Sequence, residues 1–155
     1  MPRLQSFRWV AIAATFVNLG IHLALAHDHL IEKRYIGVLF VIGSGLLGLV
    51  MIGLSTDRDR PRTAAWLLGA VINAVMLVSF VFSRTTGLPL GYHETWAAAP
   101  EDLLGLASMA LEVVFLICAA ASLRTTRVSE AAPVVSRPGL SRLRLPVHDR
   151  TAPLT

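Results

Sequence analysis

Residues 35–54 read YIGVLFVIGSGLLGLVMIGL, twenty consecutive positions without a charged side chain. At about 1.5 Å of rise per residue, a helix of this length spans about 30 Å, which matches the hydrocarbon core of a bilayer. The stretch lacks the alternation of polar and apolar residues that a barrel strand requires, and a helix satisfies its own backbone hydrogen bonds in lipid. Residues 35–54 are therefore predicted to form a transmembrane helix.

Three further stretches share this length and composition: Trp9–Ala26, Ala64–Ser83 and Leu103–Leu123. With Tyr35–Leu54 they predict an all-α fold, a polytopic membrane four-helix bundle in residues 1–123. From Arg124 onward the chain has four prolines, six arginines and few large apolar residues. Residues 124–155 are therefore predicted to be a disordered basic tail on the cytoplasmic side.

The composition agrees with a membrane protein. Hydrophobic residues make up 54% of the 155 positions and charged residues 15%, against about 45–50% and 25% in soluble domains. Eleven of the fourteen basic residues lie on one side of the four predicted helices. Because Lys and Arg beside a span are retained in the cytoplasm, both termini are predicted to be cytoplasmic, in a multi-pass protein of the cell membrane. The net charge of +4 thus reflects topology, and the expected partners are the lipid bilayer and a protein within it, with no nucleic acid.

The first span has a second interpretation. A basic amino terminus, an apolar run and residues 24–26 (ALA) also fit a secretory signal cleaved after Ala26. Cleavage would place His27-Asp28-His29 at the new amino terminus, where an amine, backbone nitrogens and imidazoles suit copper(II). The apolar run from Trp9 exceeds the usual 7 to 15 residues of a signal, which favours a retained helix.

Each predicted helix carries one polar residue near the middle of the membrane: Asn18, Ser44, Asn73 and Glu112. An ionised carboxylate in hydrocarbon is costly unless donors such as the Asn18 or Asn73 amides reach Glu112. Two polar stripes at helical spacing include these positions, one with Thr15 and His22, the other with Glu101, Gly105 and Ser108. The sequence predicts an inward-facing hydrogen-bonded layer. This layer either holds the bundle together or lines a proton or small-molecule pathway.

Four of the five histidines lie near the predicted outer surface, namely His22, His27, His29 and His93. Several acidic residues lie beside them in the sequence. Imidazole and carboxylate groups together suit copper or zinc. His27 and His29 are placed to chelate in an extended turn, whereas His22 and His93 depend on the fold to bring them together. A metal site at the outer face is one hypothesis for these residues.

The segment after the third span has a structural interpretation. Gly87 and Pro89 in residues 83–89 (SRTTGLP) are expected to stop the helix. Arg84 is expected to cap the helix carbonyls or to pair with Glu94 or Glu101. No phosphate-binding glycine loop or nucleophile elbow is present in the sequence, and the single cysteine, Cys118, lies in an apolar helix. No catalytic residues and no enzyme activity are therefore predicted.

The chain resembles small actinobacterial four-helix integral membrane proteins of unassigned function, and this resemblance implies fold and location. It rests on residues 83–89, on Glu112 in the acidic fourth helix, and on positions of the first hairpin, namely His22, His29-Leu30, Glu32, Tyr35, Gly37 and Phe40. The first function expected is a non-catalytic accessory or partner-binding membrane subunit. The alternatives are copper or zinc handling by the outer histidines and a proton or small-molecule pathway centred on Glu112.

Overall fold

The computed structural model describes residues 2–95 and 100–131, and these residues are helical apart from turns and one isolated β-bridge. The elements are α1 (Pro2–Glu32), α2 (Arg34–Ser55), α3 (Asp59–Arg84), the short 3-10 helix η1 (Pro89–Gly91) and α4 (Pro100–Ala131). Each of the four long helices is long and apolar enough to cross a membrane. The prediction of an all-α chain with four such helices is confirmed.

The helices extend beyond the apolar runs that predicted them. α1 continues past Ala26 to Glu32, and only Lys33 separates it from α2, so the loop expected around His27 and His29 was wrong. No glycine or proline interrupts this segment, which leaves the helix free to continue. α4 runs on to Ala131, so the disordered tail expected from Arg124 was wrong for residues 124–131. The rest of that tail, 132–155, lies outside the described residues.

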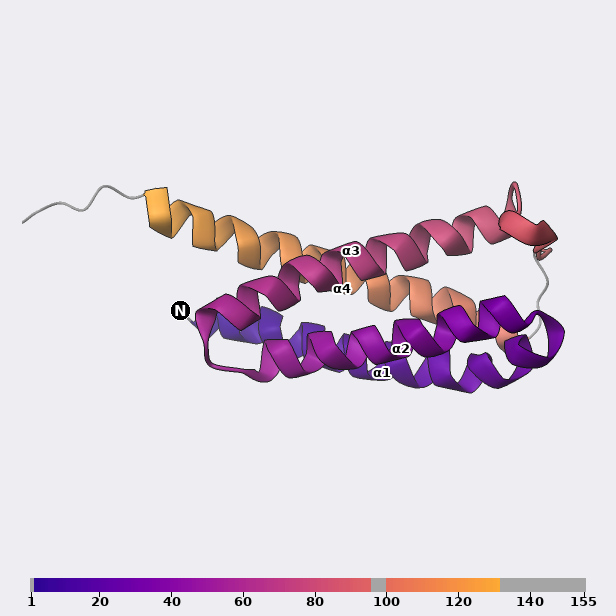
Figure 1. The fold of residues 1–155 in the computed structure, drawn as a ribbon. Helices are drawn as coiled ribbons and strands as arrows, with labels where there is room; N and C mark the ends of the chain where they lie inside the picture. The colour runs from indigo at the N-terminus through magenta and orange to yellow at the C-terminus, as the bar shows by residue number, and fades with distance from the viewer. Residues whose placement is uncertain (1, 96–99, 132–155) are drawn as a thin grey trace, which may run out of the picture.

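The four long helices form a ring in which each packs against its neighbours in sequence, with α4 closing against α1. The first turn of α1 and the last turn of α4 lie at the same end of the bundle (Figure 1). The opposite end carries Lys33 and residues 85–95. We call it the outer end, because the distribution of basic residues predicts that it faces away from the cytoplasm.

Glycines decide which helices approach closely at each end. Near the outer end, a Cβ on Gly37 would lie 2.5 Å from a backbone nitrogen of α1, and a Cβ on Gly105 would lie 2.6 Å from the Phe80 ring of α3. Near the inner end, a Cβ on Gly53 would lie 2.6 Å from Ala65 of α3. α2 therefore lies against α3 at the inner end and against α1 at the outer end, so α2 and α3 diverge outward (Figure 1).

The hydrophobic core occupies the inner half of the bundle. Leu47, Val50 and Leu54 of α2 are fully buried there. Trp66 of α3 packs against Phe115 of α4 with ring centroids 5.6 Å apart. Apolar side chains cover the outward faces of the helices, as expected for helices surrounded by lipid. The outer half of the bundle is packed differently, and the candidate site lies there.

Candidate functional site: a cavity between the helices

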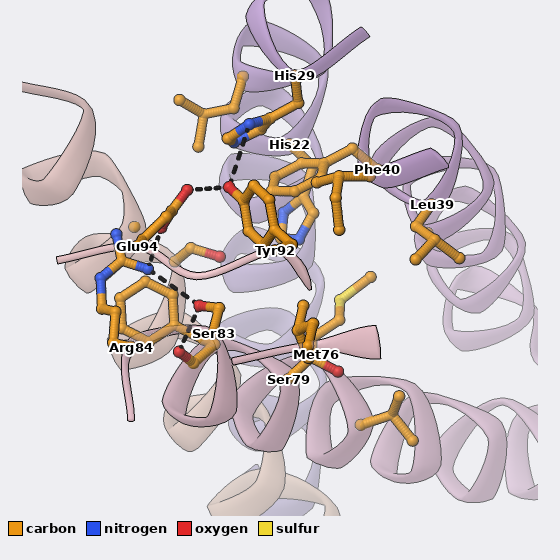
Figure 2. Close-up of a pocket in the computed structure, with 18 of the residues that line it drawn as sticks. His22, His29, Leu39, Phe40, Met76, Ser79, Ser83, Arg84, Tyr92 and Glu94 are labelled. Carbon is orange, nitrogen blue, oxygen red and sulfur yellow. Dashed lines mark hydrogen bonds and ion pairs between the residues drawn. The ribbon is translucent and has the colours of Figure 1, made fainter. Parts of the chain in front are cut away.

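A cavity of about 1200 Å³ occupies the outer half of the bundle. It extends from a mouth at the α1–α2 turn and residues 85–95 down to Glu112 in the middle of α4. Its wall is largely apolar and includes Leu39, Phe40 and Met76 (Figure 2). Leu39 of α2 and Val75 of α3 line the cavity and are also exposed. The cavity is therefore open sideways between α2 and α3, where these helices diverge.

The inner end of the cavity is a buried polar cluster from α1 and α4. Ser108 Oγ lies 2.6 Å from Asn18 Oδ1 and 3.3 Å from Glu112 Oε1. All three residues are buried, and Glu112 is 2% exposed. Two buried atoms of the cluster, Asn18 Nδ2 and Glu112 Oε2, have no hydrogen-bond partner among the described residues. Such atoms are costly in an apolar surrounding.

The predicted polar layer is only partly an interhelical network. Asn18, Ser44, Asn73 and Glu112 are all buried. Asn73 Nδ2, however, donates to the Gly69 carbonyl of its own helix at 2.7 Å, and Ser44 Oγ donates to the Phe40 carbonyl at 2.8 Å. Each side chain donates its hydrogen bond to a backbone carbonyl of its own helix. Neither is therefore seen to donate to Glu112. The link from Asn18 runs through Ser108, which belongs to the polar stripe seen in the sequence.

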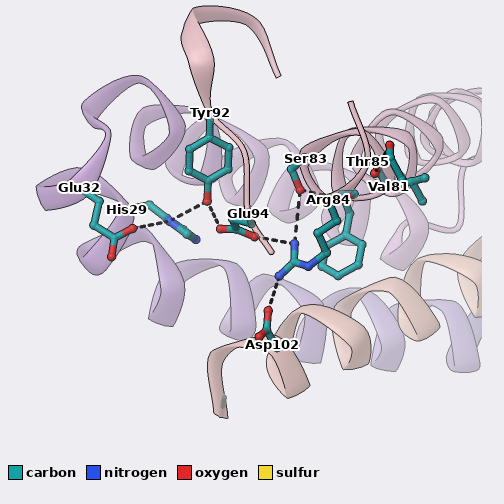
Figure 3. Close-up of polar contacts among 10 residues, drawn as sticks. His29, Glu32, Val81, Ser83, Arg84, Thr85, Tyr92, Glu94 and Asp102 are labelled. Carbon is teal, nitrogen blue, oxygen red and sulfur yellow. Dashed lines mark hydrogen bonds and ion pairs between the residues drawn. The ribbon is translucent and has the colours of Figure 1, made fainter. Parts of the chain in front are cut away.

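The mouth is closed on one side by a chain of polar contacts, which we call the outer network: Glu32, His29, Tyr92, Glu94, Arg84 and Asp102 (Figure 3). Arg84 Nη1 lies 2.6 Å from Glu94 Oε2, and Arg84 Nη2 lies 2.6 Å from Asp102 Oδ1. The pairing of Arg84 with Glu94 expected from the sequence is therefore present. Asp102 supplies the second carboxylate, and the side chain of the other expected partner, Glu101, lies outside the described residues.

Tyr92 joins the two halves of the outer network. Its hydroxyl donates to Glu94, and its oxygen lies 3.4 Å from His29 Nδ1. Burial, followed by the hydrogen bond and the negative charge of Glu94, raises the pKa of Tyr92 above its ordinary value near 10. The phenol therefore stays protonated and acts as a donor. Tyr92 therefore links α1 to the segment that follows α3.

Residues 85–95 turn back over the mouth. α3 ends at Arg84, and Gly87 adopts a φ of 81° while its N–H donates to the Phe82 carbonyl at 2.8 Å. This left-handed conformation suits glycine and ends the helix, as the sequence predicted. Pro89 opens η1, and its carbonyl accepts a hydrogen bond from the Tyr35 hydroxyl at 2.5 Å. The segment is thus tied to α2 on the far side of the mouth.

The structure does not assemble the four histidines into a metal site. Among the side chains that the structure describes, no three of His, Cys, Asp or Glu lie together as metal ligands. Because α1 continues as a helix, His27 points away from His29 and is exposed. His22 and His29 instead flank the ring of Phe40, with ring centroids 5.0 and 4.7 Å from it. His93 is exposed in the mouth segment.

The cavity lining is strongly acidic. Its carboxylates are Asp28, Glu32, Glu94, Asp102 and Glu112, and Arg84 is the one Lys or Arg among the described lining residues. Arg84 is engaged by two of these carboxylates, which leaves the remaining acidic groups without a matching cation in the lining. The potential within the cavity is therefore negative when the histidines are neutral.

No protein-family model, curated protein or solved structure matches the chain. The resemblance to small actinobacterial membrane proteins thus stays a prediction.

Proposed function

We propose that the chain is a multi-pass protein of the cell membrane, with both termini in the cytoplasm, that binds a small molecule in the cavity above Glu112. Four helices of spanning length and apolar outward faces support insertion in a bilayer. The sequence supports the orientation, because eleven basic residues belong to the segments on the predicted cytoplasmic side of the spans and three to the other side. In this orientation the cavity mouth faces the outside of the cell.

A retained first helix is part of the proposal. α1 is continuous through Ala26 and His27, and Ala26 is buried in the bundle. His22 and His29 from the same helix line the cavity, on either side of the alternative cleavage point. Cleavage after Ala26 would separate the wall of the cavity into two pieces. The bundle as described therefore favours the full-length chain over the signal-peptide interpretation.

The observation that carries the proposal is Glu112 Oε2, a buried acceptor that has no partner among the described residues and lies at the end of an open cavity. A polar residue that only holds helices together has its hydrogen bonds made by the neighbouring helix, as Ser108 Oγ of α4 donates to Asn18 Oδ1 of α1. Glu112 has one oxygen without a partner among the described residues, and Glu112 lines the inner end of the cavity. The arrangement therefore favours the pathway centred on Glu112 over a non-catalytic accessory or partner-binding subunit.

Thiol labelling tests whether the cavity opens to the outside. Ser79 lines the cavity, and its neighbour Val78 lies at the same depth but is exposed on the outward face of α3. In intact cells, a membrane-impermeant methanethiosulfonate reagent is expected to modify Ser79→Cys much faster than Val78→Cys. The native Cys118 is buried, so the unsubstituted protein serves as the background. Equal rates at the two positions, or no reaction at Ser79→Cys, would overturn the proposal.

A further inference from the structure

We infer that the ligand is an amphipathic organic amine, whose protonated nitrogen donates to Glu112 and whose apolar body lies between α2 and α3. The inference rests on the proposed function and names the chemical class that the same cavity takes. Three features carry it: the acceptors at the base, the charges of the lining and the sideways opening.

At the base of the cavity, neither Ser108 Oγ nor Asn18 Nδ2 makes a hydrogen bond to Glu112 Oε2. Ser108 Oγ has a single proton, and its shorter contact, 2.6 Å, is to Asn18 Oδ1, while Glu112 Oε1 is 3.3 Å away. Glu112 Oε2 has no partner among the described residues. A ligand group that completes this site must therefore bring an N–H or O–H donor, and a positively charged donor makes the stronger hydrogen bond to a carboxylate.

His22 supplies a second acceptor on the same wall. Its Nδ1 lies 3.0 Å from the Asn18 carbonyl oxygen, and because a carbonyl only accepts, Nδ1 carries the proton. In the neutral ring, Nε2 is then an acceptor. His22 lines the cavity one helical turn above Asn18. An ammonium group, with up to three N–H donors, matches a base that presents acceptors.

The charges of the lining disfavour an acidic ligand. The described lining contains five carboxylates and one guanidinium. Arg84, the one Lys or Arg of the described lining, is held by Glu94 and Asp102 at 2.6 Å each. Asp28 and Glu32 add negative charge at the mouth, where they attract cations toward the entrance.

The apolar walls of the cavity indicate that the rest of the ligand is a hydrocarbon. Phe40, Met76 and Leu39 line the space above the polar base, and the gap between α2 and α3 opens it toward the outward faces of these helices. A volume of about 1200 Å³ accommodates a molecule of ordinary drug size, for which pockets of about 300–1000 Å³ are typical. An amine with a compact hydrocarbon body would place its nitrogen at the base and its hydrocarbon against these walls.

Three probes with one hydrocarbon cage test the inference: 1-adamantylamine, 1-adamantanol and 1-adamantanecarboxylate. Each is added to the full-length Ser79→Cys protein before the thiol reagent, and slower labelling reports occupancy. We expect the amine to protect at a concentration about tenfold or more below that of the alcohol, because its hydrogen bond is charge-assisted. The carboxylate is expected to give no protection. Equal protection by amine and alcohol, or none by the amine, would overturn the inference.

Substitutions locate the protection at Glu112. In the Ser79→Cys background, Glu112→Gln keeps the shape of the side chain and is expected to abolish the preference for the amine. Asp57→Asn, an exposed acid at the inner end, is the matched control and is expected to leave it unchanged. Should Glu112→Gln fail to fold, Asp28→Asn combined with Glu32→Gln at the mouth is expected to weaken protection by the amine severalfold, and unchanged protection there would also count against the inference.

The two failures are distinguishable. If Ser79→Cys does not react from outside, the proposed function fails. If Ser79→Cys reacts but the amine, the alcohol and the carboxylate protect it equally, the proposed cavity is supported and only the proposed ligand class is wrong.

Discussion

Replacing Arg84 by alanine should destabilise the fold more than the loss of any other arginine ion pair that the structure describes. The Arg84 side chain is 6% exposed and lies between Asp102, 12% exposed, and Glu94, 26% exposed. Its guanidinium also covers the Phe80 ring at 4.1 Å. The substitution leaves two largely buried carboxylates close together with their shared cation gone, and it removes a link between α3, α4 and the mouth segment.

The size of the effect follows from burial. Removing one partner of a fully buried ion pair costs about 3–5 kcal/mol, because the other charge is left desolvated. Glu94 is partly open to water and recovers some hydration, so the expected loss for Arg84→Ala is about 2–4 kcal/mol. Arg84→Lys keeps the charge but loses the two-nitrogen geometry that reaches both carboxylates at once. Its loss of stability should lie about halfway between that of Arg84→Ala and zero.

The measurement is unfolding of the full-length protein in mixed micelles, followed by circular dichroism during titration with sodium dodecyl sulfate. Arg62→Ala is the control, because Arg62 pairs with Asp59 on an exposed surface where the side chains are 32% and 87% exposed. An exposed pair contributes about 0–1 kcal/mol. If Arg84→Ala costs no more than Arg62→Ala, the outer network does not stabilise the fold and the reasoning is wrong.

Two further predictions follow. Because the pKa of folded Tyr92 is raised, the folded chain keeps the phenolic proton while the unfolded chain loses it above about pH 10, so stability should fall as the pH rises past about 10. Tyr92→Phe should remove part of this loss, measured as the unfolding free energy between pH 9 and 11, and an identical pH dependence would contradict the assignment. Gly69→Ala should destabilise the bundle, because the added Cβ would collide with the Phe115 ring, whereas Gly20→Ala meets no atom within 4 Å and should stabilise α1 by about 0.5–1 kcal/mol. Equal effects of the two alanine substitutions in the same unfolding assay would refute the close packing of α3 on α4.

The helices could be predicted because uncharged runs of about twenty residues leave few alternatives. Their ends could not, since His27 and Asp28 are compatible with continued helix and no stop signal precedes Lys33. The continuation of α1 to Glu32 decides where the histidines lie. His29 lies on the same face of α1 as His22 and Asn18, whereas His27 lies on another face. Hydropathy alone does not tell where a helix of this composition ends in water.

Of the candidate site, only Glu112 and the polar residues near it could be predicted from the sequence. Glu112 stands out because a carboxylate is rare at membrane depth, and its connection to Asn18 was anticipated although the intermediary is Ser108. The outer network was not predictable, because His29 and Tyr92 are 63 positions apart in the chain. Their contact depends on the path of residues 85–95, which includes Leu90 at a φ of 64°. Such a path follows from tertiary contacts more than from local propensity.

The cavity itself follows from where the small residues lie. Helices in lipid associate by close approach of their backbones, and glycines permit that approach. At the inner end Gly53 brings α2 to α3, whereas at the outer end Gly37 brings α2 to α1 and Gly105 brings α3 to α4. Closing the outer gap would require α2 or α3 to give up one of these contacts. The outer network then ties α1, α3 and α4 together around the mouth, so the packing that stabilises the bundle also keeps the space above Glu112 open.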